Sequence, residues 1–433
     1  MRLAAALRKA VAEERFAVGL VDHGVRNRRT PVVDVAVIEL GPDGRPTAVA
    51  DVVLSKDYPR GSVVPVDDHL ETSEMRWRRW NTEEWEAGSP GSVDVVPGRE
   101  NASMEAMSPY PASVLKLMVA FGILRLVDRG VLELDETVRY RPAYSTSGCG
   151  GPGQAQLHTW LDRMITVSDN RATCVLVKKL HDLGEVKRLN ATFQDLGLHT
   201  LQIRGTNPAT GGEWVGMSMT ALDTARLLLI VADSAGRGGL RSSAPRTGAA
   251  EASGNAPSGP GILWRTSSGR GVTTSVLKQS SRAYFARLLA AQGLNQALST
   301  SNWCGRDYPA RGIPQRVPKR WIDPVDGTVT VGYRVYGQDV RPCNRRAEVE
   351  FAHKTGRTSQ AGADAGIVTS LPSAPVRRYV VAVFTNLGLR FADAHKPPNP
   401  PGVFAVPFTE KLAKLGLRID QIMTARAARS VGQ

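Results

Sequence analysis

The stretch from Val114 to Val127, VLKLMVAFGILRLV, constrains the fold of this chain more than any other feature. Nearly every position is apolar until Asp128, Arg129 and Gly130 end the run. A helix that is apolar on all sides has to be surrounded by other elements. We therefore expect a buried helix inside a globular protein, and 433 residues with 42% hydrophobic content suffice to build such a core.

Strand patterns lie near both ends of the chain. Residues 32–40 and 47–54 are β-branched runs separated by the turn sequence GPDGRP, which predicts a hairpin. Residues 347–356, 364–371 and 377–387 show three further strand patterns with short connections, typical of an antiparallel meander. We expect the two ends to form one antiparallel sheet with the terminal helices packed on it.

Helical patterns fill the middle of the chain, over residues 157–182, 219–232 and 275–293. The expected fold class is therefore α/β (α+β), with an antiparallel sheet flanked by helices and a separate helical lobe. A cleft between the sheet and the lobe is the natural ligand site.

We expect a sheet subdomain of residues 1–60 and 345–433 and a mainly helical subdomain of residues 61–344. Three segments look like additions to this frame: 56–100, 234–262 and 303–345. The second is rich in Gly, Ser, Ala and Pro, so it predicts a flexible loop. The third ends in a pattern typical of an extra strand or hairpin.

The charge balance narrows the choice of partners. Lys and Arg number 55 against 41 Asp and Glu, a net charge of +14, which suits a soluble surface and also contact with an anionic cell-wall polymer. The sequence has no zinc-finger spacing and no RNA-binding signature, so we expect no nucleic-acid partner. No apolar run is long enough to span a membrane, and the first 20 residues lack an uncharged signal-peptide core.

The cysteines and tryptophans leave alternatives open. The four cysteines show no metal-binding spacing and are either buried thiols or members of one or two disulfides: Cys149, Cys174, Cys304 and Cys343. Cys304 and Cys343 could staple the Pro-rich addition. We expect no metal site and no cofactor. Trp77, Trp80 and Trp85 could bind a ligand or a membrane surface, but the helical spacing of Trp77 and Trp80 favours anchoring of the first addition.

Three short motifs follow one another in an informative order. Ser113 and Lys116 form Ser-x-x-Lys at the start of the apolar helix, residues 168–170 read Ser-Asp-Asn, and residues 354–356 read Lys-Thr-Gly at the end of a strand pattern. In this order they resemble the signature of the active-site-serine β-lactamases and penicillin-binding DD-peptidases, and in particular the class A branch. A second Ser-x-x-Lys, at residues 275–278, has no Ser-x-Asn behind it, so we interpret it as a solvated helix start.

The resemblance assigns Ser113 as the nucleophile and Lys116 as the base that takes its proton. Positions i and i+3 share a helix face, so Ser113 Oγ and Lys116 Nζ are expected to form a hydrogen bond. Burial and the nearby cation Lys354 would lower the pKa of Lys116. The resemblance also implies that Ser168 relays a proton to the leaving nitrogen.

Substrate binding is assigned in the same way. Asn170 would orient Lys116 and the amide side chain of the substrate. Lys354 and Thr355 would receive the substrate carboxylate, with Gly356 following them in the motif. The backbone N–H groups of Ser113 and Arg357 would form the oxyanion hole. The bulk and charge of Arg357 depart from the small residues usual in the family, so we expect it to narrow or recharge the pocket.

One further departure concerns release of the acyl group. Class A β-lactamases carry a water-activating Glu in a Glu-x-x-Leu-Asn motif after Ser-Asp-Asn, and this chain has no such motif. Glu213 is the one acid in the corresponding region, either as a displaced base or as an ordinary loop acid.

The expected function is that of a serine hydrolase that forms an acyl-enzyme on β-lactam or related amide and ester substrates. The alternatives are a DD-peptidase, a hydrolase adapted to another amide or ester, and a penicillin-binding sensor that stays acylated. The expected small-molecule partner is accordingly a β-lactam, a peptide or an ester. The family suggests an extracytoplasmic location, which the chain itself leaves open.

Overall fold

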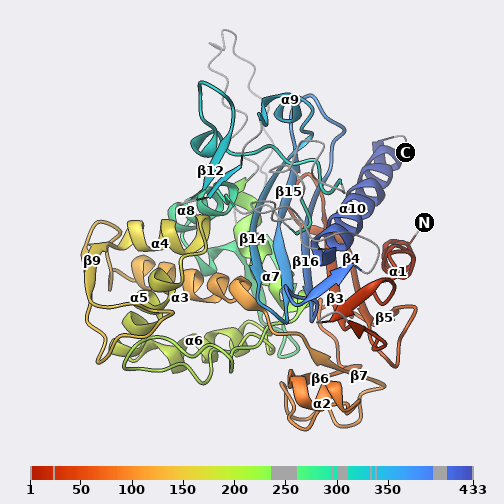
Figure 1. Cartoon of the computed structure of the whole chain (residues 1–433), viewed down its shortest axis with the longest axis horizontal. Helices are drawn as coiled ribbons and strands as arrows, with labels where there is room; N and C mark the ends of the chain where they lie inside the picture. The colour runs from red at the N-terminus through yellow and green to blue at the C-terminus, as the bar shows by residue number, and fades with distance from the viewer. Residues whose placement is uncertain are drawn as a thin grey trace.

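An antiparallel sheet built from both ends of the chain organises the structure (Figure 1). The computed structural model describes these residues: 2–22, 25–235, 261–293, 297–299, 311–331, 334–336, 339–393 and 407–431. The six strands run in the order β14 (Val349–Arg357), β15 (Gly362–Ser370), β16 (Arg378–Thr385), β3 (Val33–Leu40), β4 (Pro46–Leu54) and β5 (Ser62–Val64). Antiparallel pairing of β16 with β3, with Val380 opposite Ile38, joins the C-terminal meander to the N-terminal hairpin. The predicted sheet is confirmed.

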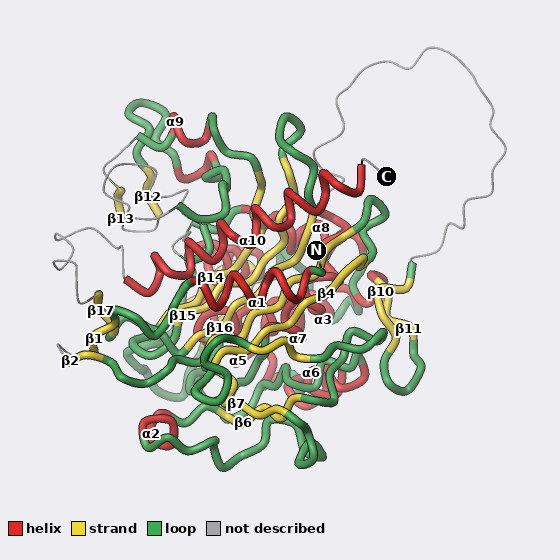
Figure 2. The backbone as a smooth tube through the Cα atoms, turned by 90° about the vertical axis from the view of Figure 1, so that its right-hand side faces the viewer, coloured by secondary structure: helices red, strands yellow, loops and turns green. Residues whose placement is uncertain are grey.

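The sheet is buried on both faces because its strands carry apolar side chains on alternate sides. Four helices cover it: α1 (Leu3–Glu13), α10 (Pro407–Val431), α7 (Ala221–Ala235) and α8 (Gln279–Ala290). Val37 shares a hydrophobic cluster with Leu7 of α1 and Leu415 of α10 on the outer face, where the two terminal helices lie side by side (Figure 2). Its neighbours Ala36 and Ile38 face the opposite cluster, toward α7 and α8.

The helical lobe surrounds the apolar stretch. Its helices are α3 (Lys116–Asp128), α4 (Leu157–Thr166), α5 (Asn170–Asp182) and α6 (Glu185–Asp195). Every residue of α3 up to Leu124 is buried, so the predicted central helix is confirmed. Gly122 permits close contact with α6, because a Cβ there would lie 2.4 Å from Leu189 Cδ2. Phe121 stacks on Phe193 of α6 with ring centroids 5.6 Å apart.

The first addition packs on the sheet subdomain. It contains α2 (Thr82–Glu86) and β6 (Met75–Arg79), which pairs in parallel with β7 (Met104–Ser108) just after the addition. Trp77 is only 4% exposed, which confirms the anchoring interpretation for this residue, although it lies on strand β6 and not on a helix. Trp80 is only partly buried. Trp85, 8% exposed, is buried as well. Arg76 and Arg78 both bind Asp94, which fixes the outer side of β6.

The other two additions are described in part. The predicted hairpin of the Pro-rich segment is present as β12 (Val329–Val331) and β13 (Arg334–Tyr336). Residues 236–260, predicted to be a flexible loop, lie outside the described residues. The remaining short elements are β1 (Leu20–Asp22), β2 (Val25–Arg26), β8 (Thr137–Tyr140), β9 (Gly153–Gln156), β10 (Ile262–Arg265), β11 (Gly271–Thr273), α9 (Arg341–Asn344), η4 (Lys319–Trp321) and β17 (Phe391–Asp393). None of the helices in the described ranges is long and apolar enough to span a bilayer.

The helix expected to start at Ser275 starts later. Ser275 lies in the 3₁₀ turn η2 (Thr274–Val276), and α8 begins at Gln279. The reason is a cap from another helix: Asp128 at the end of α3 accepts hydrogen bonds from Lys278 N and Ser281 Oγ, both at 2.6 Å. Ser275 and Lys278 are exposed.

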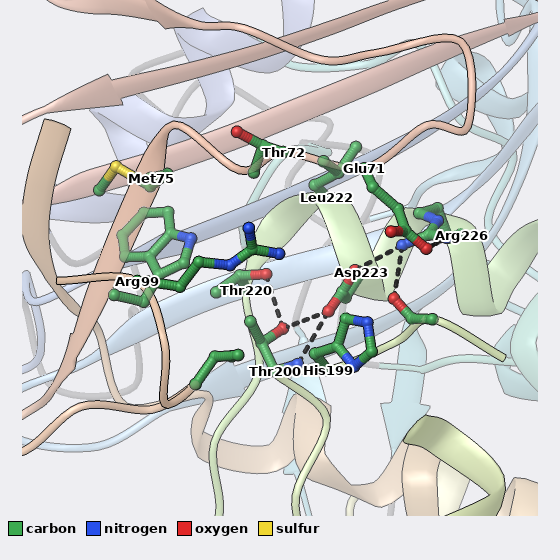
Figure 3. A pocket seen from close by; sticks show the side chains of 13 residues that line it. Glu71, Thr72, Met75, Arg99, His199, Thr200, Thr220, Leu222, Asp223 and Arg226 are labelled. Atoms are coloured by element: carbon green, nitrogen blue, oxygen red, sulfur yellow. Dashed lines mark hydrogen bonds and ion pairs between the residues drawn. The ribbon is translucent and has the colours of Figure 1, made fainter. Parts of the chain in front are cut away.

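A buried ion-pair network ties the first addition to α7 (Figure 3). Arg226, 1% exposed, binds Glu71 Oε1 at 3.2 Å and Asp223 Oδ1 at 3.0 Å. Gly197, at φ 73°, would place a Cβ 2.1 Å from Glu71 Oε1 if it carried a side chain. The close approach of these chains therefore requires glycine at this position.

Two carboxyl groups, Asp34 on β3 and Asp51 on β4, lie fully buried next to this network. The pKa of Asp34 is raised to about 7, mainly by burial; the Ala221 N–H, which donates at 2.7 Å, acts to lower this pKa and the charge of Asp223 acts to raise it. Burial also raises the pKa of Asp51 well above its usual range, with contributions from Asp34 and Asp223. The folded state therefore favours the protonated form of both groups.

These raised pKa values predict a pH-dependent stability. Their favourable contribution is complete below the unfolded pKa of about 4 and is lost as the pH rises through the folded values. Asp51→Asn, which mimics the protonated group, should therefore raise the free energy of unfolding at pH 8 and change it less at pH 5. Urea unfolding across this range measures the effect. The exposed Asp57 offers a matched control, and a gain of equal size at both pH values would contradict the prediction.

Candidate active site

Ser113 lies where a strained turn meets the central helix. It belongs to the 3₁₀ turn η1 (Ala112–Leu115), which leads directly into α3. Ala112, the preceding residue, adopts the left-handed region with φ 48°, a conformation that costs energy for a residue with a side chain. Such strain persists only where the surrounding structure enforces it, so the local fold holds Ser113 in one orientation.

Lys116 is completely buried at the first position of α3. Its Nζ forms three hydrogen bonds, to Ser168 O at 2.7 Å, Asn170 Oδ1 at 2.9 Å and Ser168 Oγ at 3.1 Å. No hydrogen bond in the described part of the chain joins it to Ser113 Oγ. The predicted Ser113–Lys116 bond is therefore not formed in this structure, because Ser113 lies in the 3₁₀ turn rather than in the α-helix and the lysine is held by Ser168 and Asn170.

A neutral amine satisfies this arrangement. It has two N–H donors and one lone pair. Ser168 O and Asn170 Oδ1 can accept the two N–H bonds, and the Ser168 hydroxyl can donate to the lone pair. Lys354 Nζ donates to Ser168 Oγ at 3.0 Å and to Thr355 O at 2.6 Å. Ser168 Oγ thus lies between the two lysine nitrogens.

Burial acts on both lysines. It lowers the pKa of Lys116 well below its usual range; the charge of Lys354 lowers it further, and Asp169 acts in the opposite direction. The pKa of Lys354 is lowered to about 7, mainly by burial. The charge of Asp364 acts to raise this pKa, and the charge of Arg357 acts to lower it. A neutral Lys116 next to a charged Lys354 is therefore accessible near neutral pH.

The Ser-Asp-Asn motif is shaped by a helix cap. Asp169 is the N-cap of α5 and accepts the Ala172 N–H at 3.1 Å. Ser168, just before it, has φ 59°, and Asn170 is the first residue of the helix. The cap thereby holds the Ser168 carbonyl and the Asn170 side chain against Lys116. The sequence motif assigned no role to Asp169, although Asp is a preferred N-cap residue.

Strand β14 brings the third motif against the nucleophile. A Cβ on Gly356 would lie 2.8 Å from Ser113 N and 2.9 Å from Pro111 O, so glycine permits this close approach. Lys354 is fully buried and Arg357 is half-buried. The charge of Arg357 contributes to the lowered pKa of Lys354, in line with the expectation that it recharges the site.

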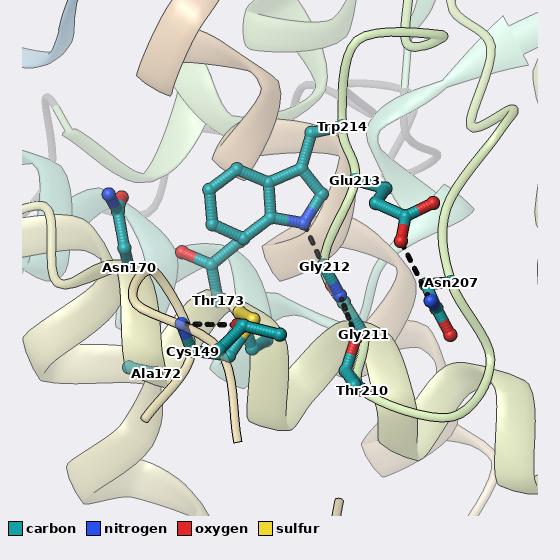
Figure 4. Close-up of a disulfide and its surroundings, with 12 residues drawn as sticks. Cys149, Asn170, Ala172, Thr173, Asn207, Thr210, Gly211, Gly212, Glu213 and Trp214 are labelled. Carbon is teal, nitrogen blue, oxygen red and sulfur yellow. Dashed lines mark hydrogen bonds between the residues drawn. A yellow bond between two sulfur atoms is a disulfide. The ribbon is translucent and has the colours of Figure 1, made fainter. Parts of the chain in front are cut away.

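Glu213 lies apart from these groups. It is exposed, and its Oε1 accepts a hydrogen bond from Asn207 Nδ2 at 2.8 Å. Figure 4 shows its carboxylate directed toward Asn207, whereas the indole of Trp214 extends in the opposite direction. No hydrogen bond in the described ranges links Glu213 to Lys116 or Ser168.

The loop that carries Glu213 rests on a disulfide. Cys149 is bonded to Cys174 of α5, a pairing that the sequence left open (Figure 4). Gly211 touches α5 so closely that a Cβ would lie 2.0 Å from Cys174 O. Cys343 is also disulfide-bonded, and its predicted partner, Cys304, lies outside the described residues.

A buried pair of a histidine on β14 and an aspartate on β15 was not identified from the sequence. His353 Nδ1 and Asp364 Oδ1 are 2.8 Å apart, and both side chains are fully buried. His353 also stacks on Phe351 with ring centroids 4.1 Å apart. In the sequence, the only indication of a role for His353 is its position directly before Lys354. Its pairing with Asp364 depends on the register of β14 and β15. Across the described ranges, no group of three or more His, Cys, Asp or Glu side chains is arranged to bind a metal.

Comparison with known proteins agrees with the motifs. Residues 93–244 match the model of the β-lactamase enzyme family. The match covers about a third of the chain. It contains the nucleophile motif, the Ser-Asp-Asn motif and the Glu213 loop. No curated protein matches the chain.

Solved structures of superfamily members also align with the chain. A PBP-A variant in an acyl-enzyme complex with penicillin G is 14% identical, with 97% of this chain and 95% of that chain covered and a TM-score of 0.47. A β-lactamase from Chitinophaga pinensis is 14% identical, with coverages of 97% and 99% and a TM-score of 0.46. A β-lactamase from Sphaerobacter thermophilus is 14% identical, with coverages of 98% and 97% and a TM-score of 0.46.

The coupling between the two lysines can be tested without a substrate. Lys354→Met removes a cation that lowers the pKa of Lys116, so that pKa should rise. NMR titration of protein labelled with ¹³C at the lysine ε-carbons measures it. Lys278→Met, at the exposed second Ser-x-x-Lys, should leave the Lys116 signal unchanged. An unaltered Lys116 titration in the Lys354 variant would show that burial alone sets its pKa.

Proposed function

We propose that this protein is a serine hydrolase that forms an acyl-enzyme on β-lactams or related amides and esters. The observation that carries the proposal is the fully buried Lys116, which follows Ser113 by three positions in the sequence. Its pKa is lowered, and its amine is held by hydrogen bonds to Ser168 and Asn170 of the Ser-Asp-Asn motif. Burial of a cationic group without a counter-ion is unfavourable, so a buried lysine of this kind is suited to act as a base.

In the proposed acylation, Ser113 Oγ attacks the substrate carbonyl. Lys116 accepts the serine proton, directly or through the Ser168 hydroxyl that it contacts at 3.1 Å. The C–N bond then breaks, and Ser168 Oγ delivers a proton to the leaving nitrogen and regains one from Lys116, which returns to the neutral amine. The result is an ester of Ser113 and a free amine.

Binding groups complete the proposed site. The Ser113 and Arg357 N–H groups stabilise the oxyanion, and Lys354 and Thr355 receive the substrate carboxylate. Asn170 positions Lys116 and the acyl amide, and Gly356 keeps β14 close to Ser113. The net charge of +14 is compatible with an anionic cell-wall polymer as a further partner. The Cys149–Cys174 disulfide is compatible with an oxidising, extracytoplasmic compartment.

Release of the acyl group is proposed to be slow. The absence of the Glu-x-x-Leu-Asn motif and the exposed, Asn207-bound position of Glu213 support this proposal. A penicillin-binding protein that stays acylated is therefore the second candidate function, and a DD-peptidase shares the same three motifs.

The assignment of the nucleophile predicts the outcome of covalent labelling. Ser113→Ala should abolish labelling by a fluorescent penicillin, because no other serine opens the ordered motifs. Ser275→Ala is the matched control from the exposed second Ser-x-x-Lys and should label like the wild type. Gel fluorescence and intact-protein mass spectrometry measure the adduct. Labelling lost in the Ser275 variant and retained in the Ser113 variant would reverse the assignment.

Slow release predicts a burst. Benzylpenicillin should yield one equivalent of product followed by a slow steady state, with an adduct that persists after excess drug is removed. The lack of general-base assistance should slow release by about a hundred- to ten-thousand-fold relative to an enzyme that has the loop carboxylate. Stopped-flow absorbance and mass spectrometry measure both phases.

Glu213→Gln is the internal control for this prediction. An unchanged release rate agrees with an ordinary loop acid, whereas slower release would identify Glu213 as a displaced base. Rapid hydrolysis by the wild type with no burst and no adduct would contradict slow release.

A further inference from the structure

A cavity of about 520 Å³ lies beside the proposed active site. Its walls come from three parts of the chain: Arg79 and Trp80 of the first addition, Tyr110 and Met217 from the segments around the nucleophile and the Glu213 loop, and Thr358 and Gln360 after the Lys-Thr-Gly motif. The volume falls within the usual range of small-molecule sites, about 300 to 1,000 Å³.

The chain geometry connects this cavity to Ser113. Tyr110 precedes Ser113 by three residues, and Thr358 follows Gly356 by two. Gly356 itself lies against the Ser113 backbone. The segment that leads to Ser113 and the segment that follows Gly356 therefore both contribute to the cavity wall.

The first addition supplies the cavity with a cation. Arg79 is the last residue of β6 and pairs with Ser108 of β7, so the parallel strand pair brings it next to the segment that leads to Ser113. It shares a strand face with Trp77, whose side chain is packed against the protein body. Arg79, two residues after Trp77 on this face, lines the cavity instead of the core.

Arg79 has no counter-ion. No ion pair or side-chain hydrogen bond to it occurs among the described residues, and its Nε is buried without a partner. By contrast, Arg76 and Arg78 of the same strand both bind Asp94. A partly buried guanidinium without a partner is costly, and an anionic ligand group would satisfy it.

The cavity wall is fixed in place by hydrogen bonds. Trp80 Nε1 donates to Thr82 Oγ1 at 3.1 Å, and the Thr82 hydroxyl donates to Gln360 Oε1 at 2.7 Å. This chain of bonds ties the first addition to the loop after β14. Burial raises the pKa of Tyr110 to about 12, so its phenol stays neutral. The charged side chains that line the cavity are those of Arg79 and the exposed Glu83.

We propose that Arg79 and Trp80 make this cavity a specificity pocket for acyl groups that carry a carboxylate beside a flat or aromatic ring. The carboxylate would bind the Arg79 guanidinium, and the ring would lie against Trp80 and Met217. This inference rests on the proposed function, because it assigns the acyl substituent of the substrate that acylates Ser113.

Carbenicillin and benzylpenicillin test the proposal, since they differ by one carboxylate on the acyl group. The wild type should be acylated faster by carbenicillin. Arg79→Gln should lower the second-order acylation rate with carbenicillin by about 10- to 100-fold and with benzylpenicillin by less than about 3-fold, the range for loss of one charge-assisted hydrogen bond. Arg79→Lys keeps the charge and should retain much of the preference. The exposed Arg60 lies outside the cavity, so Arg60→Gln should behave like the wild type.

A binding measurement separates this proposal from the acylation chemistry. In Ser113→Ala, monomethyl phenylmalonate should bind more tightly than methyl phenylacetate, and Arg79→Gln in that background should abolish the difference; ligand-observed NMR measures both. Equal binding of the two esters, or a preference that survives Arg79→Gln, would overturn the specificity pocket. Failure of penicillin to acylate Ser113 would instead overturn the proposed function, and the ester measurement would still decide the role of Arg79.

Discussion

The burial of the Lys116 amine at the base of an apolar helix is the constraint on which the rest of the structure depends. A lysine in this position cannot be solvated, so its hydrogen bonds must come from neighbouring elements. Ser168 and Asn170 supply them from the start of α5, and Ser168 in turn contacts Lys354 on the sheet. The helical lobe and the sheet are thus joined at the point where the proposed chemistry takes place.

Buried charge recurs elsewhere in the protein for a structural purpose. Arg226 links Glu71 of the first addition to Asp223 of α7, and Asp34 caps the start of the same helix through the Ala221 N–H. These contacts fix the addition on the sheet and on the helical lobe. The addition can therefore present Arg79 to the cavity from a rigid strand rather than from a loop.

Much of the fold was predictable because its signals are local. The β3–β4 hairpin, the β14–β16 meander and the apolar α3 follow from side-chain periodicity and turn residues alone. The motifs that contain Ser113, Ser168 and Lys354 are likewise short patterns that can be recognised in the sequence. The predicted start of α8 was wrong because the residue that caps this helix is Asp128, which lies 150 positions away from Lys278 in the sequence.

By itself, the sequence determined the elements, the three motifs and the expectation that Lys116 is buried, because each depends on neighbouring residues or on an apolar pattern. Only the tertiary structure decided which partners Lys116 has, that Cys149 bonds to Cys174, and that Arg79 lines a cavity together with Tyr110 and Thr358. These features depend on the strand register and on the packing of segments far apart in the chain. No local pattern encodes a distance between such segments, so the geometry of the site emerges only when the sheet and the helical lobe are assembled.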